Sequence, residues 1–212
     1  MITLYTWTTP NGRKISILLE EMGIAYEVKP INIGANEQFA PAFLAVSPNN
    51  KIPAIVDSEG PDGPLSVFES GAILTYLADK HGQFLPATGA ARWKTLEWLA
   101  WQVGGLGPML GQLGYFAGRA PEKLPLAINR FVEESQRLLK VMDGRLQEAP
   151  YLGGDYSIAD IAAYPWVAGA ASMTQGPLAA TFAELSATRR RMEAIAARPA
   201  VPRGMAVPKL PG

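Results

Sequence analysis

The chain contains no cysteine and a single histidine, His81, among its 212 residues. Without cysteine it can form no disulfide, bind no zinc through thiolates and supply no thiol nucleophile of its own. One histidine also argues against a histidine-based metal site or a Ser-His-Asp triad. We therefore expect no metal, and any sulfur chemistry needs a sulfur atom that arrives on a ligand.

Charge is also sparse and balanced. The 19 basic residues match the 19 acidic ones, and charged residues make up 18% of the chain, below the ~25% typical of soluble domains. Nucleic-acid binding needs a surplus of Lys and Arg, so we expect no nucleic-acid partner. The uncharged stretch 98–118 holds Pro108 and several glycines, which favours a buried bend over a membrane span. No secretory signal is visible, so we expect a cytoplasmic protein without a membrane partner.

The first third of the chain alternates strand and helix signals. Runs rich in β-branched and aromatic residues predict strands over residues 2–7, 26–31, 53–57 and 65–68. Apolar residues at helical spacing predict a helix over 15–22, and a second helix is expected from Ser70 to about Lys80. The order β-α-β followed by β-β-α predicts an α/β domain over residues 1–83.

Beyond that domain only helical patterning is found. Helices are predicted near residues 90–103, 125–147, 158–171 and 182–197. Ser157 and Asp160 fit a capping box at the start of the third of these helices. The prolines after residue 198 predict an extended tail, so residues 90–212 are expected to form an all-α domain with that tail.

Three short motifs carry candidate chemistry. Thr9-Pro10-Asn11-Gly12 joins a strand to a helix N-terminus, where backbone N–H groups and the helix dipole favour an anion such as a thiolate. Ile52-Pro53 opens a strand, and a cis bond there would leave the Ile52 backbone free to pair with an extended ligand; the sequence does not decide the isomer.

The third motif is Glu69-Ser70 at a helix start. As an N-cap, Ser70 could offer its hydroxyl to a carboxylate, and Glu69 could accept an ammonium group. Each motif alone also fits an ordinary cap, turn or edge strand. Together they suit a thiolate, a peptide backbone and an α-amino acid head group, which are the three parts of glutathione.

The sequence resembles the cytosolic glutathione transferases over nearly its full length, and more narrowly the bacterial nu class. The resemblance lies in Thr9-Pro10-Asn11-Gly12, the run from Ser47 to Asp57, the run from Leu65 to Leu74, Trp101-Gln102-Val103-Gly104-Gly105-Leu106-Gly107-Pro108-Met109, and Tyr156-Ser157-Ile158-Ala159-Asp160. It implies a thioredoxin-like N-terminal domain, an all-α C-terminal domain and a homodimer.

The resemblance also implies roles for single residues. Thr9 and Asn11 would lie nearest the glutathione sulfur, as catalytic residues. The glutathione-binding residues would be Gln38 and Lys51 at the glycine carboxylate, Ile52 and Pro53 at the cysteinyl unit, Glu69 and Ser70 at the γ-glutamyl end, Gln102 from the partner subunit, and Arg130 over the cleft.

The activity implied is reduction of a small disulfide by a bound glutathione thiolate, with reduced or oxidised glutathione as the ligand. Conjugation of glutathione to an apolar electrophile, or peroxide reduction, is an alternative enzymatic reading. A non-catalytic glutathione-binding module is another, because folds are reused without their chemistry.

Overall fold

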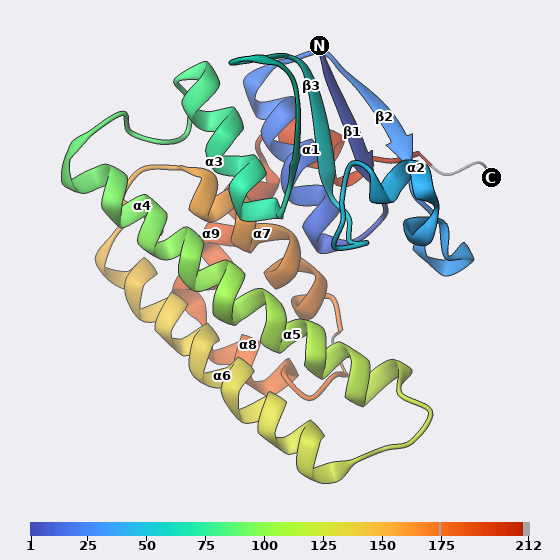
Figure 1. Cartoon of the computed structure of the whole chain (residues 1–212). Helices are drawn as coiled ribbons and strands as arrows, with labels where there is room; N and C mark the ends of the chain where they lie inside the picture. Colours follow the sequence, from blue (N-terminus) through green and yellow to red (C-terminus); the bar gives the residue numbers. More distant parts are fainter. Residues whose placement is uncertain (174, 210–212) are drawn as a thin grey trace. The chain divides into compact units, whose positions relative to one another are not determined.

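The computed structural model describes residues 1–173 and 175–209. They form two compact units. The first comprises Met1–Gln83 together with the chain from Ala196 on, and the second comprises Phe84–Ile195. Figure 1 shows that the first unit holds the β-sheet, while the second is built from helices.

The sheet of the first unit has four strands, β1 (Ile2–Thr6), β2 (Tyr26–Pro30), β3 (Ala54–Gly60) and β4 (Gly63–Phe68), in the order β2-β1-β3-β4. β1 and β2 are parallel and joined through α1 (Pro10–Met22), as the strand-helix-strand order predicts. β1–β3 and β3–β4 are antiparallel, and the β3–β4 hairpin turns with Gly63 at φ 110°. The predicted mixed α/β arrangement is therefore confirmed.

Two helices cover this sheet and end as the sequence predicts. α1 buries Ile15, Leu18 and Leu19 completely and stops at Gly23, whose φ of 66° is left-handed. α3 (Ser70–His81) stops at Gly82 in the same conformation. Between β2 and β3 the chain forms only short turns of helix: η1 (Ile33–Ala35), η2 (Glu37–Phe39) and α2 (Pro41–Leu44).

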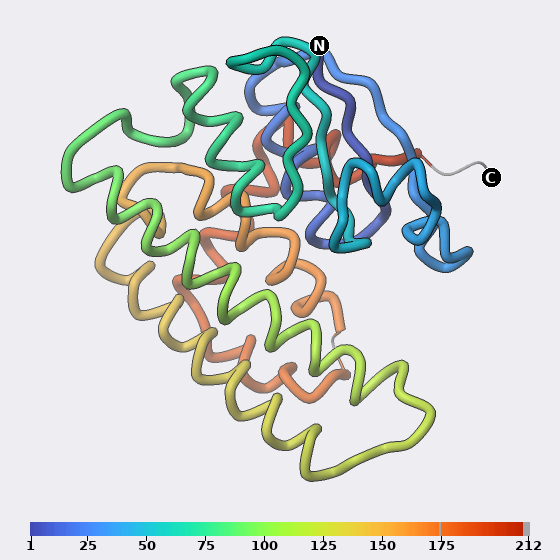
Figure 2. Tube along the Cα trace, viewed as in Figure 1, coloured from blue at the N-terminus to red at the C-terminus, as the bar shows by residue number. Residues whose placement is uncertain are grey.

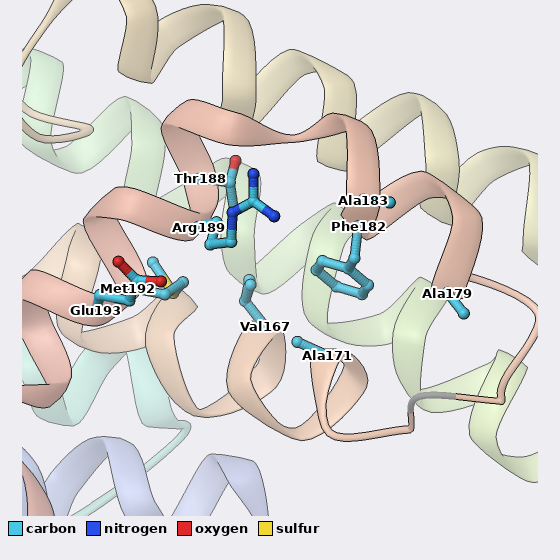
Figure 3. Close-up of a pocket in the computed structure, with 9 residues that line it drawn as sticks. All are labelled: Val167, Ala171, Ala179, Phe182, Ala183, Thr188, Arg189, Met192 and Glu193. Atoms are coloured by element: carbon cyan, nitrogen blue, oxygen red, sulfur yellow. The ribbon is translucent and has the colours of Figure 1, made fainter.

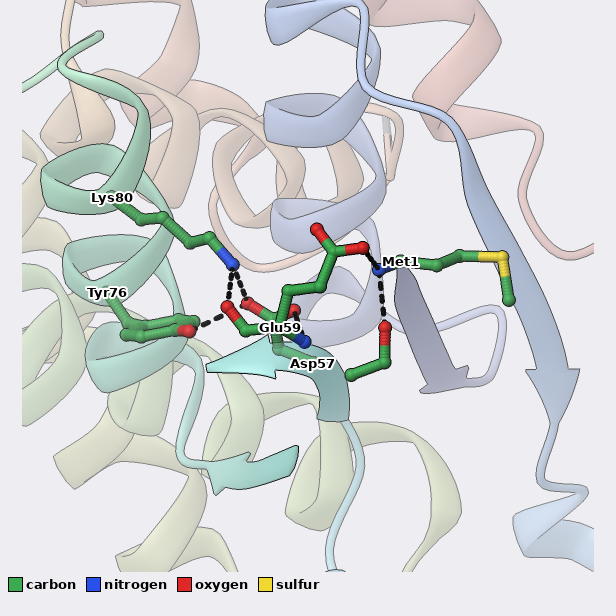
Figure 4. Close-up of polar contacts among 6 residues, drawn as sticks. Met1, Asp57, Glu59, Tyr76 and Lys80 are labelled. Carbon is green, nitrogen blue, oxygen red and sulfur yellow. Dashed lines mark hydrogen bonds and ion pairs between the residues drawn. The ribbon is translucent and has the colours of Figure 1, made fainter. Parts of the chain in front are cut away.

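A polar network fixes the middle of α3 to β3 (Figure 4). The buried Asp57 carboxylate accepts hydrogen bonds from the Tyr76 hydroxyl at 2.7 Å and from the Lys80 ammonium. Burial alone would raise the pKa of Asp57, but the hydrogen bonds from Lys80 and Tyr76 outweigh it and hold that pKa below its ordinary value. The network therefore keeps a charged carboxylate paired inside the unit.

The end of the chain departs from the prediction. Residues from Ala196 on group with the first unit, and Ala200–Met205 form a helix, α10, that packs against α1. Figure 2 shows this red segment returning beside the blue N-terminal helix. The expectation of an extended tail is wrong over Ala200–Met205, which are helical, and the described residues from Ala196 group with the first unit, whereas the sequence placed them with the helical domain. Residues 210–212 of the expected tail lie outside the described residues. Pro199 and Pro202 lie at the N-cap and in the first helical turn, where proline is tolerated because no helical N–H is needed.

The second unit is a set of helices around one apolar core. In chain order they are α4 (Gly89–Trp101), the π-helix η3 (Gln102–Leu106), α5 (Gly107–Gly114), the π-helix η4 (Tyr115–Arg119), α6 (Pro125–Glu148), α7 (Ile158–Ala171), α8 (Ala179–Glu184) and α9 (Ser186–Ala196). The single helix predicted near 182–197 is two helices, because the backbone leaves helical geometry at Leu185 with ψ 71°.

The capping box is confirmed at the start of α7. The Ser157 backbone N–H donates to Asp160 Oδ2 at 3.2 Å, while Ser157 Oγ accepts from the helix backbone. Asp160 Oδ1 also accepts from the N–H of Leu152 at 3.0 Å, so the same carboxylate ties the preceding loop to the helix. Within the described ranges, no helix is both long enough and apolar enough to cross a membrane.

Candidate functional site

The three motifs predicted from the sequence meet in one small pocket of the first unit. It has a volume of about 150 Å³ and is lined by Asn11, Lys51, Ile52, Pro53, Phe68, Glu69 and Ser70. Six of these seven residues are among the predicted site residues. The seventh is Phe68, the last residue of β4, which is 37% exposed. The sequence predicted Phe68 only as part of a strand.

The first wall of the pocket is the start of α1. Thr9 is the N-cap, and its Oγ1 accepts a hydrogen bond from the Gly12 N–H at 3.2 Å, which leaves its own O–H to donate. Asn11 follows in the first helical turn and lines the pocket. Thr9 does not line it. The helix N-terminus adds partial positive charge at this wall.

The second wall is the loop before β3. The Ile52–Pro53 peptide bond is cis. Ser47 Oγ donates to the Lys51 carbonyl at 2.9 Å, which holds the loop in place. The paired residues of β3 begin at Ala54, so Ile52 lies just ahead of the sheet. Its neighbour Lys51 is exposed and places a cation at the mouth of the pocket.

The third wall is the junction of β4 and α3. Glu69 adopts a φ of 70°, a conformation that side-chain-bearing residues rarely take. Its Oε1 accepts a hydrogen bond from Asn49 Nδ2 at 3.3 Å. Glu69 is the N-cap of α3, so the expectation that Ser70 is the cap is wrong; Ser70 is the first helical residue. Its hydroxyl is therefore not committed to capping the helix.

Sequence reasoning missed Lys14. It lies in α1 with 1% of its surface exposed, and its Nζ is 3.2 Å from Ser70 Oγ. Burial lowers the pKa of Lys14 to about 7, although the nearby Glu69 carboxylate acts in the opposite direction. A signal was present, because Lys14 precedes Leu18 by four residues and so lies on the buried face of the helix.

Three predicted residues lie elsewhere. Gln38 is in η2 and does not line the pocket; its Oε1 is buried without a hydrogen-bond partner among the described residues. Gln102 is fully buried in the second unit, and both amide atoms lack partners in the described part of the chain. In this structure its amide is thus closed off from ligands. Arg130 is exposed on α6, with its Nη1 3.7 Å from Glu134 Oε2.

A larger pocket lies inside the second unit, between α7, α8 and α9 (Figure 3). It has a volume of about 380 Å³, and its wall is mainly apolar, including Val167, Phe182 and Met192. Arg189 and Glu193 supply its charges. None of the site residues predicted from the sequence lines it. Over residues 1–173 and 175–209, no cluster of three or more His, Asp or Glu side chains is arranged to hold a metal ion.

The geometry of the smaller pocket defines what it can bind. A helix N-terminus and the Asn11 side chain favour an anion at one wall, and the Ser70 hydroxyl can donate to a carboxylate at another. Glu69 can accept an ammonium group beside it. A pocket with these three kinds of group beside a mixed four-stranded sheet suits a small ligand that carries both an α-amino acid group and a further anion.

Comparison with known proteins identifies the class. Residues 1–79 match the family model described as glutathione S-transferase, N-terminal domain. The chain is 56% identical over 170 residues to the disulfide-bond oxidoreductase YfcG of Escherichia coli strain K12, covering 79% of each chain. It is 41% identical to YghU, a disulfide-bond oxidoreductase of the same strain, over the whole of this chain and 76% of that one.

A solved structure gives the same result. The glutathione transferase of Burkholderia graminis, crystallised with two glutathione molecules bound per subunit, superposes with a TM-score of 0.94 at 45% identity, over 99% of this chain and 89% of that one. The chain therefore belongs to the glutathione transferase family. Within that family it is nu-class-like, which confirms the resemblance seen in the sequence.

Proposed function

We propose that this protein is a glutathione-dependent disulfide-bond oxidoreductase. The observation that carries the proposal is that Asn11, Ile52 and the Glu69–Ser70 pair line one pocket of a chain without cysteine. Such a site can hold a thiol tripeptide and must borrow its reactive sulfur. The names of the two Escherichia coli relatives, and the two glutathiones in the Burkholderia graminis structure, support the same activity.

In this proposal each wall binds one part of glutathione. The γ-glutamyl carboxylate accepts from Ser70 and the adjacent ammonium faces Glu69, while the Ile52 backbone pairs with the cysteinyl unit. Lys51 and Gln38 hold the glycine carboxylate. The sulfur then lies toward the start of α1, where Thr9 and Asn11 donate hydrogen bonds to its thiolate form. Each unit by which the thiol pKa falls corresponds to ~1.4 kcal/mol, within reach of one or two charge-assisted bonds.

The reaction is thiol–disulfide exchange in two steps. The bound thiolate attacks one sulfur of the substrate disulfide, so a mixed disulfide forms and the other substrate sulfur leaves as a thiolate that takes up a proton. A second glutathione thiolate then attacks the glutathione sulfur of the mixed disulfide. The second substrate thiol leaves, and oxidised glutathione is released. Two glutathione molecules are oxidised for each disulfide reduced, and the protein itself is unchanged.

The test is turnover of a small dialkyl disulfide with glutathione, coupled to the reduction of oxidised glutathione by glutathione reductase and NADPH. A chromogenic electrophile and an alkyl peroxide are assayed in parallel. We expect the disulfide to be turned over faster than either of these. A rate equal to the uncatalysed exchange, or a higher rate with the electrophile or the peroxide, would contradict the proposal.

Two Thr9 variants make the test specific to the sulfur site. Thr9→Val removes the hydroxyl with little change of shape, and Thr9→Ser keeps it. Losing a hydrogen bond to a charged group costs roughly 1.5–3 kcal/mol, so we expect kcat to fall about 10- to 100-fold in Thr9→Val and by far less in Thr9→Ser. Thr9 is also the N-cap of α1, and losing that cap costs about 1 kcal/mol of stability. Thermal unfolding measures this loss of stability separately from the change in kcat. Equal rates in the two variants would remove Thr9 from the mechanism.

We also propose a homodimer in the cytoplasm, where a reduced glutathione pool supplies the co-substrate. Trp93 of α4 is 71% exposed, and a side chain of this size supports a covered face on that helix. Sedimentation equilibrium tests the assembly, and Trp93→Glu is expected to shift it toward monomer. A monomeric wild-type protein at micromolar concentration would contradict it.

A further inference from the structure

Lys14 is a buried cation directly behind the pocket wall. It lies in the second turn of α1 and is 1% exposed, and its Nζ contacts Ser70 Oγ at 3.2 Å across 56 residues of sequence. Ser70 lines the pocket, whereas Lys14 does not. Ser70 is itself 7% exposed, so the bond is shielded from solvent. Burying an ammonium group with so few partners costs folding free energy, so its presence beside the pocket indicates a functional role.

The bond determines which way the Ser70 hydroxyl points. When Lys14 is protonated, its ammonium group has only N–H donors, so Ser70 Oγ must be the acceptor. The hydroxyl proton of Ser70 is therefore left to donate to another group. Because Ser70 lines the pocket and is not the helix cap, an acceptor bound in the pocket completes its hydrogen bonding. A carboxylate is the acceptor that an ammonium ion behind the serine favours most.

We propose that Lys14 is a positioning residue that aims the Ser70 hydroxyl into the pocket and stores a positive charge behind it, so that binding of a ligand carboxylate takes up a proton. The inference rests on the proposed function, because it takes the γ-glutamyl carboxylate of glutathione as the group that Ser70 meets. It goes beyond that function by making ligand affinity depend on a protonation event inside the protein.

Glu69 is the main charged partner of Lys14, because the other charged groups on the elements around α1 pair elsewhere or lie farther away. Glu69 is the charge that raises the Lys14 pKa against the effect of burial. On the C-terminal segment, Arg198 and Arg203 pair with Glu21 and Glu20 of α1 itself. On α3, Tyr76 and Lys80 bond to Asp57, and Asp79 and His81 lie about 14–16 Å along the helix from Ser70. On β1, Tyr5 is covered by Lys29.

The expected size of the effect follows from the geometry. A carboxylate that accepts from the Ser70 hydroxyl lies about 6 Å from Nζ, which at an effective dielectric constant of 20 corresponds to about two pKa units. The ligand ammonium beside Glu69 offsets part of this, so we expect a rise of at least one unit above the unliganded pKa of about 7. Protonated lysine then binds the ligand better, and affinity falls as pH rises.

The experiment is isothermal titration calorimetry with S-methylglutathione, a thioether that removes the thiol from the proton balance. Titrations at pH 6, 7 and 8 are repeated in buffers of different ionisation enthalpy. For the wild-type protein we expect uptake of about 0.4 proton per site at pH 7 and at pH 8, and roughly fivefold weaker binding at pH 8 than at pH 6. These quantities need no variant, so they stand even where a substitution at position 14 unfolds the chain.

Two variants separate charge from packing. Lys14→Arg keeps the cation but does not titrate in this range, so we expect near-wild-type affinity without proton uptake. Lys14→Met removes both the charge and the bond to Ser70, and we expect about tenfold weaker binding with no pH dependence between pH 6 and 8. Proton exchange by the ligand itself is common to all three proteins and cancels in their differences.

The outcomes distinguish the two proposals. If the wild-type protein binds no S-methylglutathione, the proposed function fails. If it binds with an enthalpy that is independent of buffer, or if Lys14→Met keeps the wild-type affinity and pH profile, the role of Lys14 is refuted while glutathione binding stands.

Discussion

The contact between α10 and α1 is close enough to be tested with one methyl group. A Cβ at Gly204 would lie 2.5 Å from the Cα and 2.6 Å from the backbone N of Ile17. Both are main-chain atoms of a buried helix, so neither can rotate out of the way. Gly204→Ala must therefore push α10 away from α1, and the hydrogen bond from Ser16 Oγ to the Gly204 carbonyl, 2.7 Å long, is strained with it.

The magnitude follows from three contributions. Overpacking costs about 1–3 kcal/mol, and the threatened hydrogen bond adds about 1 kcal/mol. Replacing glycine by alanine in a helix returns about 1 kcal/mol. We expect a net loss of about 2 kcal/mol in the free energy of unfolding, which at this chain length lowers Tm by about 4–8 °C. Differential scanning calorimetry measures both quantities.

Gly144→Ala is the matched control. Gly144 lies in α6, and a Cβ there meets no atom within 4 Å. The same substitution is therefore expected to stabilise the protein by up to about 1 kcal/mol, because alanine favours the helix. If Gly204→Ala raised Tm as Gly144→Ala does, α10 would not lie against α1 as described, and the assignment of the C-terminal segment to the first unit would be refuted.

Four further substitutions probe the interactions that stabilise each unit. Asp57→Asn is expected to lower the free energy of unfolding by about 2 kcal/mol at pH 7. Because the pKa of Asp57 is lowered in the folded state, the difference in stability between variant and wild type should shrink as pH falls below the ordinary aspartate range. A difference that urea unfolding finds independent of pH would argue against the ion pair with Lys80. Ser157→Ala removes the α7 cap and should cost about 1 kcal/mol by the same measurement, with no loss contradicting the capping box. Arg198→Ala should destabilise the protein more than Arg203→Ala, because Arg198 donates to Glu21 from two nitrogens at 2.7 and 2.8 Å and is the less exposed of the two arginines. A larger drop in Tm for Arg203→Ala would refute this ranking.

Local chemistry made much of the first unit predictable. Thr9 before Pro10 and Gly23 after Met22 mark the ends of α1 through capping rules that act within a few residues. The pocket could be predicted because each wall is a short motif, and the fold brings the motifs together. The Lys14–Ser70 contact could not be, because it joins residues 56 apart and depends on how α1 and α3 pack.

The C-terminal helix was missed for a different reason. A short segment with two prolines has little intrinsic helicity, and α10 is stabilised mainly by tertiary packing, with Val201 1% exposed and Gly204 against Ile17. Local patterns do not contain that information. The same holds for the π-helical turn Gln102–Leu106, whose glycines predicted a bend but not its hydrogen-bond pattern.

The return of the last helix to the first has a consequence for biosynthesis. Ser16 and Gly204 are 188 residues apart, and a ribosome adding roughly 5–20 residues per second needs about 10–40 seconds to make the chain between them. Throughout that time the face of α1 that α10 covers in the complete protein has no partner helix. The unit whose translation begins first is thus completed only when the last helix has been made.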